Sequence, residues 1–133
     1  MGAVAYIDSS ALIKLLTNEP ETSLLEADLA NRDGLVSSRL ASIECGRAMM
    51  RTSNKRLLQA LAHVLDAVYL VDITTAILDR AATLAPAPMR SLDAIHLATA
   101  LSLDEPDLEI ITYDSRMADA ARANGLPVSQ PGR

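Results

Sequence analysis

The sequence predicts an α/β fold in which helices cover a parallel sheet. Short runs of β-type residues alternate along the chain with longer runs of helical periodicity, the pattern expected when each strand is followed by a crossover helix. The first β-type run, residues 3–7, is mostly apolar, as in a strand covered on both faces. With 133 residues, half of them apolar and 22% charged, the chain is sized for a single domain, residues 1–133.

The first half of the chain reads as helices placed between short strands. Apolar residues recur at helical spacing between residues 10 and 16. Pro20 suits the first turn of the next helix, where its missing N–H is not needed. Gly34 precedes another short β-type run. After the strand 3–7, the expected elements are helices 10–16 and 20–30, a strand 35–37, helices 40–52 and 55–67, and a strand 69–71.

The second half carries clear start and stop signals. Thr74 or Thr75 can cap a helix that reaches about residue 84, and two prolines beyond it stop that helix. Ser91 is expected to cap the following helix. Asn124 and Gly125 form a C-cap signal for the last helix. The expected elements are the helix 75–84, a helix 92–103, a strand 108–112, a helix from 114 or 115 to 123, and a final edge strand at 127–128.

The charge balance limits the classes of partner. Twelve Lys and Arg residues against seventeen Asp and Glu residues leave a formal net charge of −5. Proteins that hold nucleic acid through bulk positive potential carry the opposite balance. Three tyrosines, with no Phe or Trp, also offer few platforms on which bases could stack. Nucleic acid would therefore bind only where the negative charge is overcome locally, and a bound divalent metal is one means of doing so.

The single cysteine and the apolar runs bear on location. Cys45 excludes a disulfide within the chain and a cysteine-based metal cluster, and it suits a reducing compartment. The apolar start of the chain is interrupted at Asp8, which argues against a secretory signal. No charge-free apolar run approaches the ~18 residues of a membrane span. We therefore expect a cytoplasmic protein without a membrane partner.

Two acidic residues stand where predicted strands end. Asp8 follows the first strand, and Asp114 follows the strand 108–112. All strands of a parallel sheet end along one edge, where open α/β folds place their ligands. Each Asp alone is explained equally well as the N-cap of the helix that follows it. The occurrence of both at the same edge favours a site.

Two further acids are predicted to face packed sides of helices. Glu44 shares a helical stripe with apolar residues, where a carboxylate is costly unless it is paired or binds a metal. An ion pair with Arg47, one turn away, explains this position about equally well. Asp93 lies in the first turn of a nearly all-apolar helix, where the helix dipole alone is a sufficient reason for an acid. It precedes Leu97 by one turn and so faces the packed side.

The four acids together predict more than each one does alone. Carboxylates gathered at one sheet edge repel one another and raise their own pKa values. Bound Mg²⁺ or Mn²⁺ removes this penalty, because hard divalent cations prefer oxygen ligands. When the four are removed from the seventeen acids, thirteen remain against twelve bases, so the acidic excess mostly belongs to this set. The set predicts a site for one or two divalent cations, and its members are Asp8, Glu44, Asp93 and Asp114.

Other arrangements of reactive residues are expected to be structural. Cys45 adjoins the apolar stripe of its helix and fits a small core residue. His96 lies within an apolar helix and fits a packed, hydrogen-bonded histidine. His63 has no acid at helical spacing other than Asp66. No Ser-His-Asp arrangement and no phosphate-binding glycine loop can be assembled from this chain.

The main alternative is a non-enzymatic Mg²⁺-binding signalling module similar to a response-regulator receiver, which also gathers carboxylates at strand ends. However, no acidic pair precedes Asp8, and no lysine follows Lys55 to serve a phosphoryl group. A phosphatase of the DxDxT type lacks its second acid, because Ser10 occupies that position. A protein-binding module would explain Glu44 and Asp93 by salt bridges alone.

Four segments, in order and nearly end to end, resemble the PIN-domain family and, within it, the VapC-type toxins of toxin–antitoxin pairs. The segment 90–98 (RSLDAIHLA) is the most specific of them. The others are residues 6–12 (YIDSSAL), Glu44 in the third helix, and residues 112–117 (TYDSRM). The resemblance implies a PIN-like three-layer α/β/α fold with a central five-stranded parallel sheet.

The resemblance also implies an activity, Mg²⁺- or Mn²⁺-dependent cleavage of RNA by an endoribonuclease. The family's acidic positions map onto the four acids named above, among which Asp8 and Asp93 are the expected direct metal ligands. Its small hydroxyl residues map onto Ser10 and Thr112, and Arg90 also fits the pattern. The resemblance further implies a VapB-type antitoxin partner whose tail lies across the site, and a homodimer. The low aromatic content leaves the surface that contacts RNA unspecified.

A basic segment follows Glu44. No acid occurs between Glu44 and Asp66, whereas Arg47 and Arg51 lie one and two turns beyond Glu44 on nearly the same helix face. We hypothesise that these two arginines form a phosphate track that leads RNA to the metal site. A solvated helix face is the plainer interpretation of either residue alone.

Overall fold

The computed structural model describes residues 3–133, which form a five-stranded parallel sheet, as the sequence predicted. The strand order is β3-β2-β1-β4-β5, and every neighbouring pair is parallel. The first strand in the chain is therefore the central one. The strands are β1 (Ala5–Ile7), β2 (Leu35–Ser38), β3 (Tyr69–Val71), β4 (Glu109–Ile111) and β5 (Val128–Ser129).

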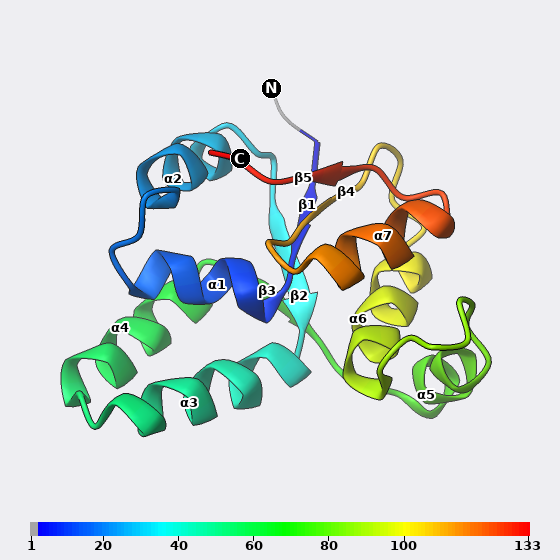
Figure 1. Ribbon diagram of the computed structural model, residues 1–133, viewed down its shortest axis with the longest axis horizontal. Helices are drawn as coiled ribbons and strands as arrows, with labels where there is room; N and C mark the ends of the chain where they lie inside the picture. The colour runs from blue at the N-terminus through cyan, green and yellow to red at the C-terminus, as the bar shows by residue number, and fades with distance from the viewer. Residues whose placement is uncertain (1–2) are drawn as a thin grey trace.

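Seven helices within the described residues connect these strands: α1 (Ser9–Leu16), α2 (Thr22–Ala30), α3 (Leu40–Thr52), α4 (Lys55–Leu65), α5 (Thr75–Ala82), α6 (Ser91–Ser102) and α7 (Ser115–Ala123). Figure 1 shows α1 to α4 on one face of the sheet and α6 and α7 on the other, with α5 outside α6. The predicted three-layer α/β/α arrangement is thus confirmed. Among residues 3–133, no helix has the length and apolar character needed to cross a membrane.

The central strand divides the core into two halves. Ala5 and Ile7 pack with the helices on the α1–α4 side, whereas Tyr6 packs against α6 and α7. Successive side chains of a strand point to opposite faces, so a strand covered on both faces is buried at every position. All three residues are almost fully buried. This double burial is why an apolar run located the strand in the sequence.

The register of β1 and β4 sets the position of the site. Ile7 of β1 pairs with Ile111 of β4. Because the two strands run in the same direction, the residues that follow this pair emerge together at the carboxyl edge of the sheet. Those residues are Asp8 and Thr112, from the first and the last of the predicted motifs.

The element boundaries agree with the predictions to within two residues, but two predicted start signals were wrong. Ser91 is the first residue of α6 rather than its cap, and Arg90 holds the cap position without a side-chain hydrogen bond. Pro20 precedes α2, because the Thr22 hydroxyl accepts a hydrogen bond from Glu19 N (3.0 Å) and holds this segment as a turn. Neither start is fixed by a side-chain cap, because Glu21 and Arg90, at the two cap positions, form no side-chain hydrogen bond with the helix.

The remaining cap predictions were correct. The Thr74 side chain accepts a hydrogen bond from Ile77 N at the start of α5. Asn124 is the C-cap of α7. Gly125 follows it with a φ of 78°, a left-handed conformation that glycine adopts at little cost.

Candidate active site

Asp8 and Asp114 stand at the carboxyl edge of the sheet, and each caps a helix. Asp8 Oδ1 accepts a hydrogen bond from Ala11 N (3.1 Å) at the start of α1. Asp114 Oδ1 accepts from Arg116 N (2.9 Å) and Met117 N (3.3 Å) at the start of α7. Both caps use a single carboxylate oxygen. The capping and the site interpretations are therefore compatible.

Asp8 is the most deeply buried of the four acids, at 4% exposure. Its Oδ1 also accepts a hydrogen bond from Ser10 Oγ (2.6 Å), and its Oδ2 accepts a short one from Thr112 Oγ1. Burial raises the pKa of Asp8 above its usual value, and the two hydroxyl donors act in the opposite direction. The structure thus places Ser10 and Thr112 where they orient this carboxylate.

The same two hydroxyls join the ends of β1 and β4. Ser10 Oγ accepts a hydrogen bond from Tyr113 N (2.9 Å), and Thr112 Oγ1 accepts from Asp114 N (3.1 Å). The two hydroxyl oxygens are 3.3 Å apart. One small polar network therefore sets the positions of Asp8 and Asp114 relative to each other, although they are 106 positions apart in the chain.

Asp93 projects from the first turn of α6 into the same region. Burial raises the pKa of Asp93, and the negative charge of Asp114 raises it further. His96 opposes this rise, Asp8 adds to it, and Arg90 opposes it less strongly. These influences show that carboxylates from three separate segments lie near enough to repel one another.

The partner of Glu44 is His96 and not Arg47, the neighbour proposed from sequence. Glu44 Oε1 lies 2.7 Å from His96 Nε2, and its side chain is 20% exposed. Arg47 lies one turn further along α3 and is exposed. Helical spacing pointed to the nearby arginine, but α3 and α6, from opposite faces of the sheet, approach each other at its carboxyl edge and bring together two residues that are 52 positions apart.

His96 is packed and hydrogen-bonded, as predicted, but it also lines the site. Its Nδ1 is 2.6 Å from the Tyr6 hydroxyl. Burial and the nearby Asp8 carboxylate raise the pKa of Tyr6 far above its usual value, so the phenol stays protonated. The other ring nitrogen, Nε2, faces Glu44. His96 follows Asp93 by about one helical turn, and this spacing was the sequence signal that could have placed His96 in the site.

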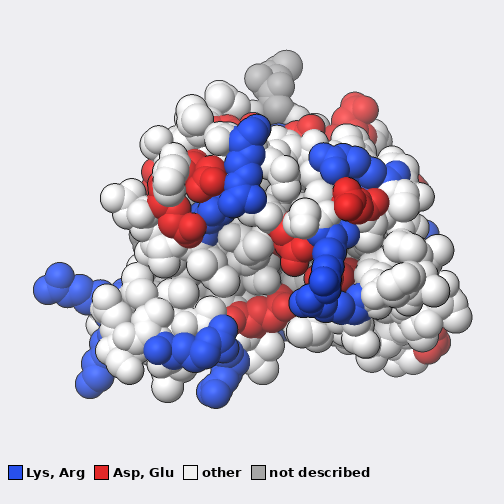
Figure 2. All heavy atoms as spheres, viewed as in Figure 1, with Lys and Arg blue, Asp and Glu red and all other residues white. Residues whose placement is uncertain are grey.

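These residues line one cleft of about 270 Å³. In Figure 2, acidic side chains occupy the hollow between the α1–α4 half and the α6–α7 half of the molecule. The cleft residues come from four parts of the chain: Asp8, Ser9, Ser10, Glu44, Arg90, Ser91, Leu92, Asp93, His96 and Asp114. The structure therefore brings together all four acids that the sequence singled out.

The acids of the cleft are not neutralised by lysine or arginine. Among residues 3–133, the ion pairs of the protein involve other acids, apart from the Glu44–His96 contact. No three His, Cys, Asp or Glu side chains of this part of the chain are gathered closely enough to hold a metal ion as they stand. The cleft is thus a set of oxygen donors lining one space, without an assembled ligand sphere.

Basic side chains flank the cleft on two sides. Figure 2 shows Lys and Arg residues over α3 and over the α6–α7 half, with the acidic hollow between them. Arg47 and Arg51 are both exposed on α3, the helix that carries Glu44. Arg90 lines the cleft itself, and Arg116, which the sequence analysis did not single out, lies beside it in the neighbouring pocket.

Cys45 is not one of the reactive groups of the cleft. Cys45 is fully buried in the core and unpaired. Burial raises the pKa of its thiol to about 12, and the charges of Glu44 and Asp8 contribute. A thiol held neutral is neither a nucleophile nor a metal ligand. His63 is exposed on α4, outside the cleft.

Comparison with known proteins identifies the family. The PIN domain model matches residues 5–123. Ribonuclease VapC46 of Mycobacterium tuberculosis is 43% identical over 132 residues, covering 97% of this chain and 98% of its own. Ribonuclease VapC47 of the same species is 34% identical, covering 96% of each chain.

Solved structures share the fold at low sequence identity. A toxin–antitoxin complex from Klebsiella pneumoniae matches with a TM-score of 0.66 and 23% identity, covering 96% of this chain and 97% of that one. VapBC2 from Rickettsia felis, bound to a promoter DNA fragment, matches with a TM-score of 0.71 and 11% identity, covering 95% and 97%. The chain therefore belongs to the PIN-domain family and, within it, to the VapC-type toxins.

Proposed function

We propose that this protein is the ribonuclease toxin of a toxin–antitoxin pair and that it hydrolyses RNA phosphodiester bonds in the four-acid cleft with Mg²⁺ or Mn²⁺. The observation that carries the proposal is the convergence of Asp8, Glu44, Asp93 and Asp114 from four separate segments on one cleft. Nearly full-length relatives named as ribonucleases support the reaction. Membership of the PIN family disfavours the receiver-like signalling alternative.

The donors of the cleft fit a divalent cation. Carboxylate oxygens are the ligands that Mg²⁺ and Mn²⁺ prefer. The raised pKa values of Asp8 and Asp93 reflect a burial and repulsion cost that positive charge would offset. Asp8 and Asp93 would hold the ion, with Glu44 and Asp114 as further ligands or as acceptors for water. When bound, such a cation supplies the activation of water near neutral pH and the neutralisation of phosphate charge.

The protein's own groups have separate tasks in this proposal. Ser10 and Thr112 hold the carboxylate of Asp8 in one orientation. His96 holds Glu44 through Nε2 and Oε1, which leaves the second oxygen of Glu44 free to accept a proton or a hydrogen bond. Arg90, in the same cleft, provides a cation for a phosphate oxygen. Arg47 and Arg51 extend positive charge along α3 for the approaching RNA.

The proposal includes an antitoxin partner. Three solved structures that share this fold are a toxin–antitoxin complex and two VapBC proteins. Among residues 3–133 the acids of the cleft form no ion pair with Lys or Arg, so a partner segment that supplies a positive charge would be stabilised there. We propose a VapB-type antitoxin in this place, with a homodimer of the toxin as the core of the hetero-oligomer.

The decisive test combines metal-dependent cleavage with metal binding. Wild type and Asp93→Asn are incubated with a panel of defined RNAs in Mg²⁺, Mn²⁺ or EDTA, and Mn²⁺ binding is measured by calorimetry. We expect wild type to cleave at least one RNA only with metal, and Asp93→Asn to lose cleavage by about 100-fold or more together with Mn²⁺ affinity.

Asp79→Asn serves as the matched control, because Asp79 is an exposed acid on α5 outside the cleft. It removes the same charge and should leave cleavage and Mn²⁺ binding unchanged. Equal cleavage by wild type and Asp93→Asn, or equal activity in EDTA, would overturn the proposal.

A further inference from the structure

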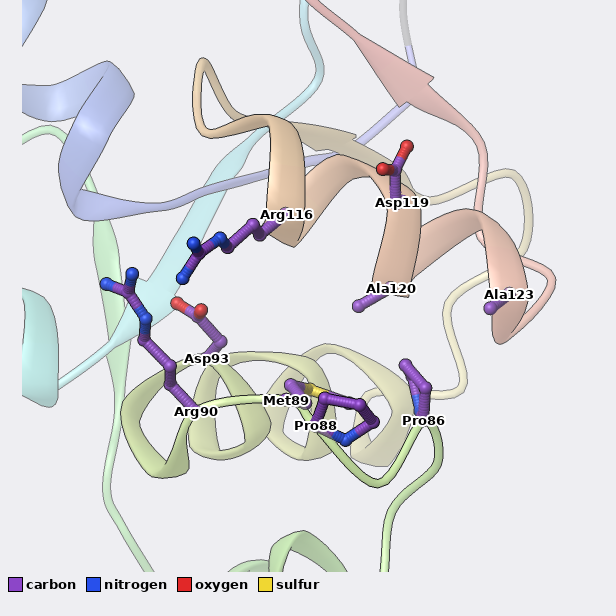
Figure 3. A pocket seen from close by; sticks show the side chains of 9 residues that line it. All are labelled: Pro86, Pro88, Met89, Arg90, Asp93, Arg116, Asp119, Ala120 and Ala123. Carbon is purple, nitrogen blue, oxygen red and sulfur yellow. The ribbon is translucent and has the colours of Figure 1, made fainter.

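A second pocket adjoins the four-acid cleft. Its volume is about 620 Å³, within the range of roughly 300–1,000 Å³ that holds small ligands. It lies between α7 and the segment that leads into α6 (Figure 3). Arg90 and Asp93 line both spaces, so the pocket opens directly onto the cleft. Its lining residues are Pro86, Pro88, Met89, Arg90, Asp93, Arg116, Asp119, Ala120 and Ala123.

Two guanidinium groups and the carboxylate of Asp93 meet at the end of the pocket next to the cleft, so cations outnumber acids there. The guanidinium groups of Arg90, at the cap position before α6, and of Arg116, on α7, reach toward the Asp93 end (Figure 3). Within residues 3–133, neither arginine forms an ion pair. The carboxylate of Asp119 points away from the pocket and lies 3.6 Å from Arg122. Two guanidinium groups therefore remain available to an anionic ligand at this end.

The other end of the pocket is apolar. Pro88 and Met89 form one wall, and Ala120 and Ala123 of α7 form the opposite wall (Figure 3). The pocket is held in shape, because Asn124 Nδ2 at the end of α7 donates a hydrogen bond to the carbonyl oxygen of Ala85 (2.9 Å). Small and cyclic side chains on two facing walls leave a slot for a flat ligand group.

We infer that this pocket binds one nucleotide of the RNA next to the scissile phosphate, with the base between the apolar walls and its phosphate on Arg90 and Arg116. The inference rests on the proposed ribonuclease function and assigns the cleft a subsite for its substrate. A nucleotide combines the two features that the pocket requires, a flat apolar face and a phosphate. Guanidinium groups bind phosphate in bidentate geometry and with charge assistance.

The net charge of the protein strengthens this assignment. A chain with a net charge of −5 repels RNA at long range, so phosphate must be held where cations are concentrated. Arg90 and Arg116 concentrate two cations beside the acids. A strand whose scissile phosphate lies in the cleft reaches the pocket with its next nucleotide, because Arg90 and Asp93 border both spaces. A peptide segment of a protein partner has no backbone phosphate to place on Arg90 and Arg116, so it matches the pocket less well than a nucleotide does.

The test measures RNA binding without cleavage. Binding of a fluorescently labelled short single-stranded RNA is followed by anisotropy in EDTA over a range of salt concentrations. The variants are Arg116→Ala and Ala123→Leu, of which the second fills the apolar end and keeps a residue that favours helices. Their matched controls are Arg122→Ala on the same helix and Ala62→Leu at an exposed position of α4.

The two variants should fail in different ways. Arg116→Ala should weaken binding about fivefold or more and flatten the slope of log affinity against log salt by about 0.7, the loss of one phosphate contact to a single strand. Ala123→Leu should weaken binding about fivefold and leave the slope unchanged, since it blocks only the base. Both control variants should bind as wild type does.

Three results would overturn the inference: no RNA binding by wild type in EDTA, wild-type affinity in both pocket variants, or unchanged RNA affinity together with lost binding of the antitoxin. The last result would assign the pocket to the protein partner. Parallel cleavage assays in Mn²⁺ separate this inference from the proposed function. Binding in the pocket without any cleavage would refute the ribonuclease and leave the pocket as a nucleotide-binding site without a reaction, whereas cleavage unaffected by either pocket variant would refute the subsite alone.

Discussion

Asp8 combines two roles in one side chain. As the N-cap of α1 it needs only an oxygen acceptor, which Asn or Ser would provide without a charge. Its burial makes the charge costly, as the raised pKa records. A buried aspartate at a cap that a neutral residue would serve equally well indicates that the charge itself is used. Asp93 lies in the first turn of α6 and not at its cap, but its charge is costly for a similar reason, because burial and repulsion by Asp114 and Asp8 raise its pKa.

The stability of the metal-free protein should therefore improve when Asp93 loses its charge. The folded-state pKa of Asp93 is raised above 3.8, so its unfavourable contribution is absent below about pH 3.8 and grows as the pH rises through the folded-state pKa. We expect Asp93→Asn to match wild type in melting temperature below this pH and to exceed it by a few degrees at pH 7. Thermal unfolding in EDTA across this pH range checks the prediction.

Added Mn²⁺ provides the complementary measurement. It should raise the melting temperature of wild type more than that of Asp93→Asn, because the cation stabilises only the folded state that binds it. Asp79→Asn should follow wild type at every pH. A melting temperature for Asp93→Asn below that of wild type at pH 7 would show that the carboxylate stabilises the fold, contrary to this prediction.

At the scale of elements, the sequence correctly predicted the strands and helix ends that are set by local sequence patterns. Apolar runs located β1 and β4, and hydroxyl or amide caps located the start of α5 and the end of α7. The starts of α2 and α6 were predicted wrongly, because neither helix has a side-chain cap that a sequence pattern could reveal. Strand direction was enough to place Asp8 and Asp114 at one edge, since every strand of a parallel sheet ends there.

The contacts between elements could not be derived from spacing. The partner of Glu44 comes from α6, and the residue that orients this partner comes from β1. The resulting chain, Tyr6 to His96 to Glu44, connects the centre of the sheet to the cleft through two hydrogen bonds of 2.6 and 2.7 Å. Only the packing of α3 and α6 around the end of β1 brings these three side chains together.

We expect the two hydrogen bonds from Tyr6 through His96 to Glu44 to act by positioning the Glu44 carboxylate. His96→Phe keeps a ring of similar size but removes both hydrogen bonds, so kcat should fall about 10- to 100-fold with little change in KM. Tyr6→Phe removes only the first hydrogen bond and should have a smaller effect. Single-turnover and steady-state cleavage of an RNA that wild type cuts provide the measurement. His96→Gln, which retains a donor, should recover part of kcat.

Thermal unfolding separates positioning from structure in the same variants. A purely structural role predicts that kcat follows the folded fraction and that His96→Gln and His96→Phe are impaired to the same degree. Equal kcat for wild type and folded His96→Phe would contradict the positioning role.

At the scale of the whole molecule, charge is separated rather than balanced. The acids of the cleft lie in a hollow between basic side chains over α3 and over the α6–α7 half (Figure 2). The net charge of −5 would keep RNA away, but local cations within about one Debye length, ~8 Å at physiological salt, act more strongly than distant acids. The fold thus presents cations at the borders of an acidic centre, and α3 contributes both Glu44 and two of these cations.

The contribution of the two α3 arginines to RNA cleavage can be measured with the double variant Arg47→Ala and Arg51→Ala. Both arginines are exposed, so their removal leaves the core intact, and cleavage should weaken severalfold through kcat/KM. The dependence of kcat/KM on salt should also flatten, because fewer phosphate contacts are lost on screening. Arg80→Ala, an exposed arginine on α5, is the matched control and should change neither quantity. If the double variant keeps the wild-type rate and salt dependence, the RNA reaches the acids by another route, and the pocket beside Arg90 and Arg116 becomes the remaining candidate.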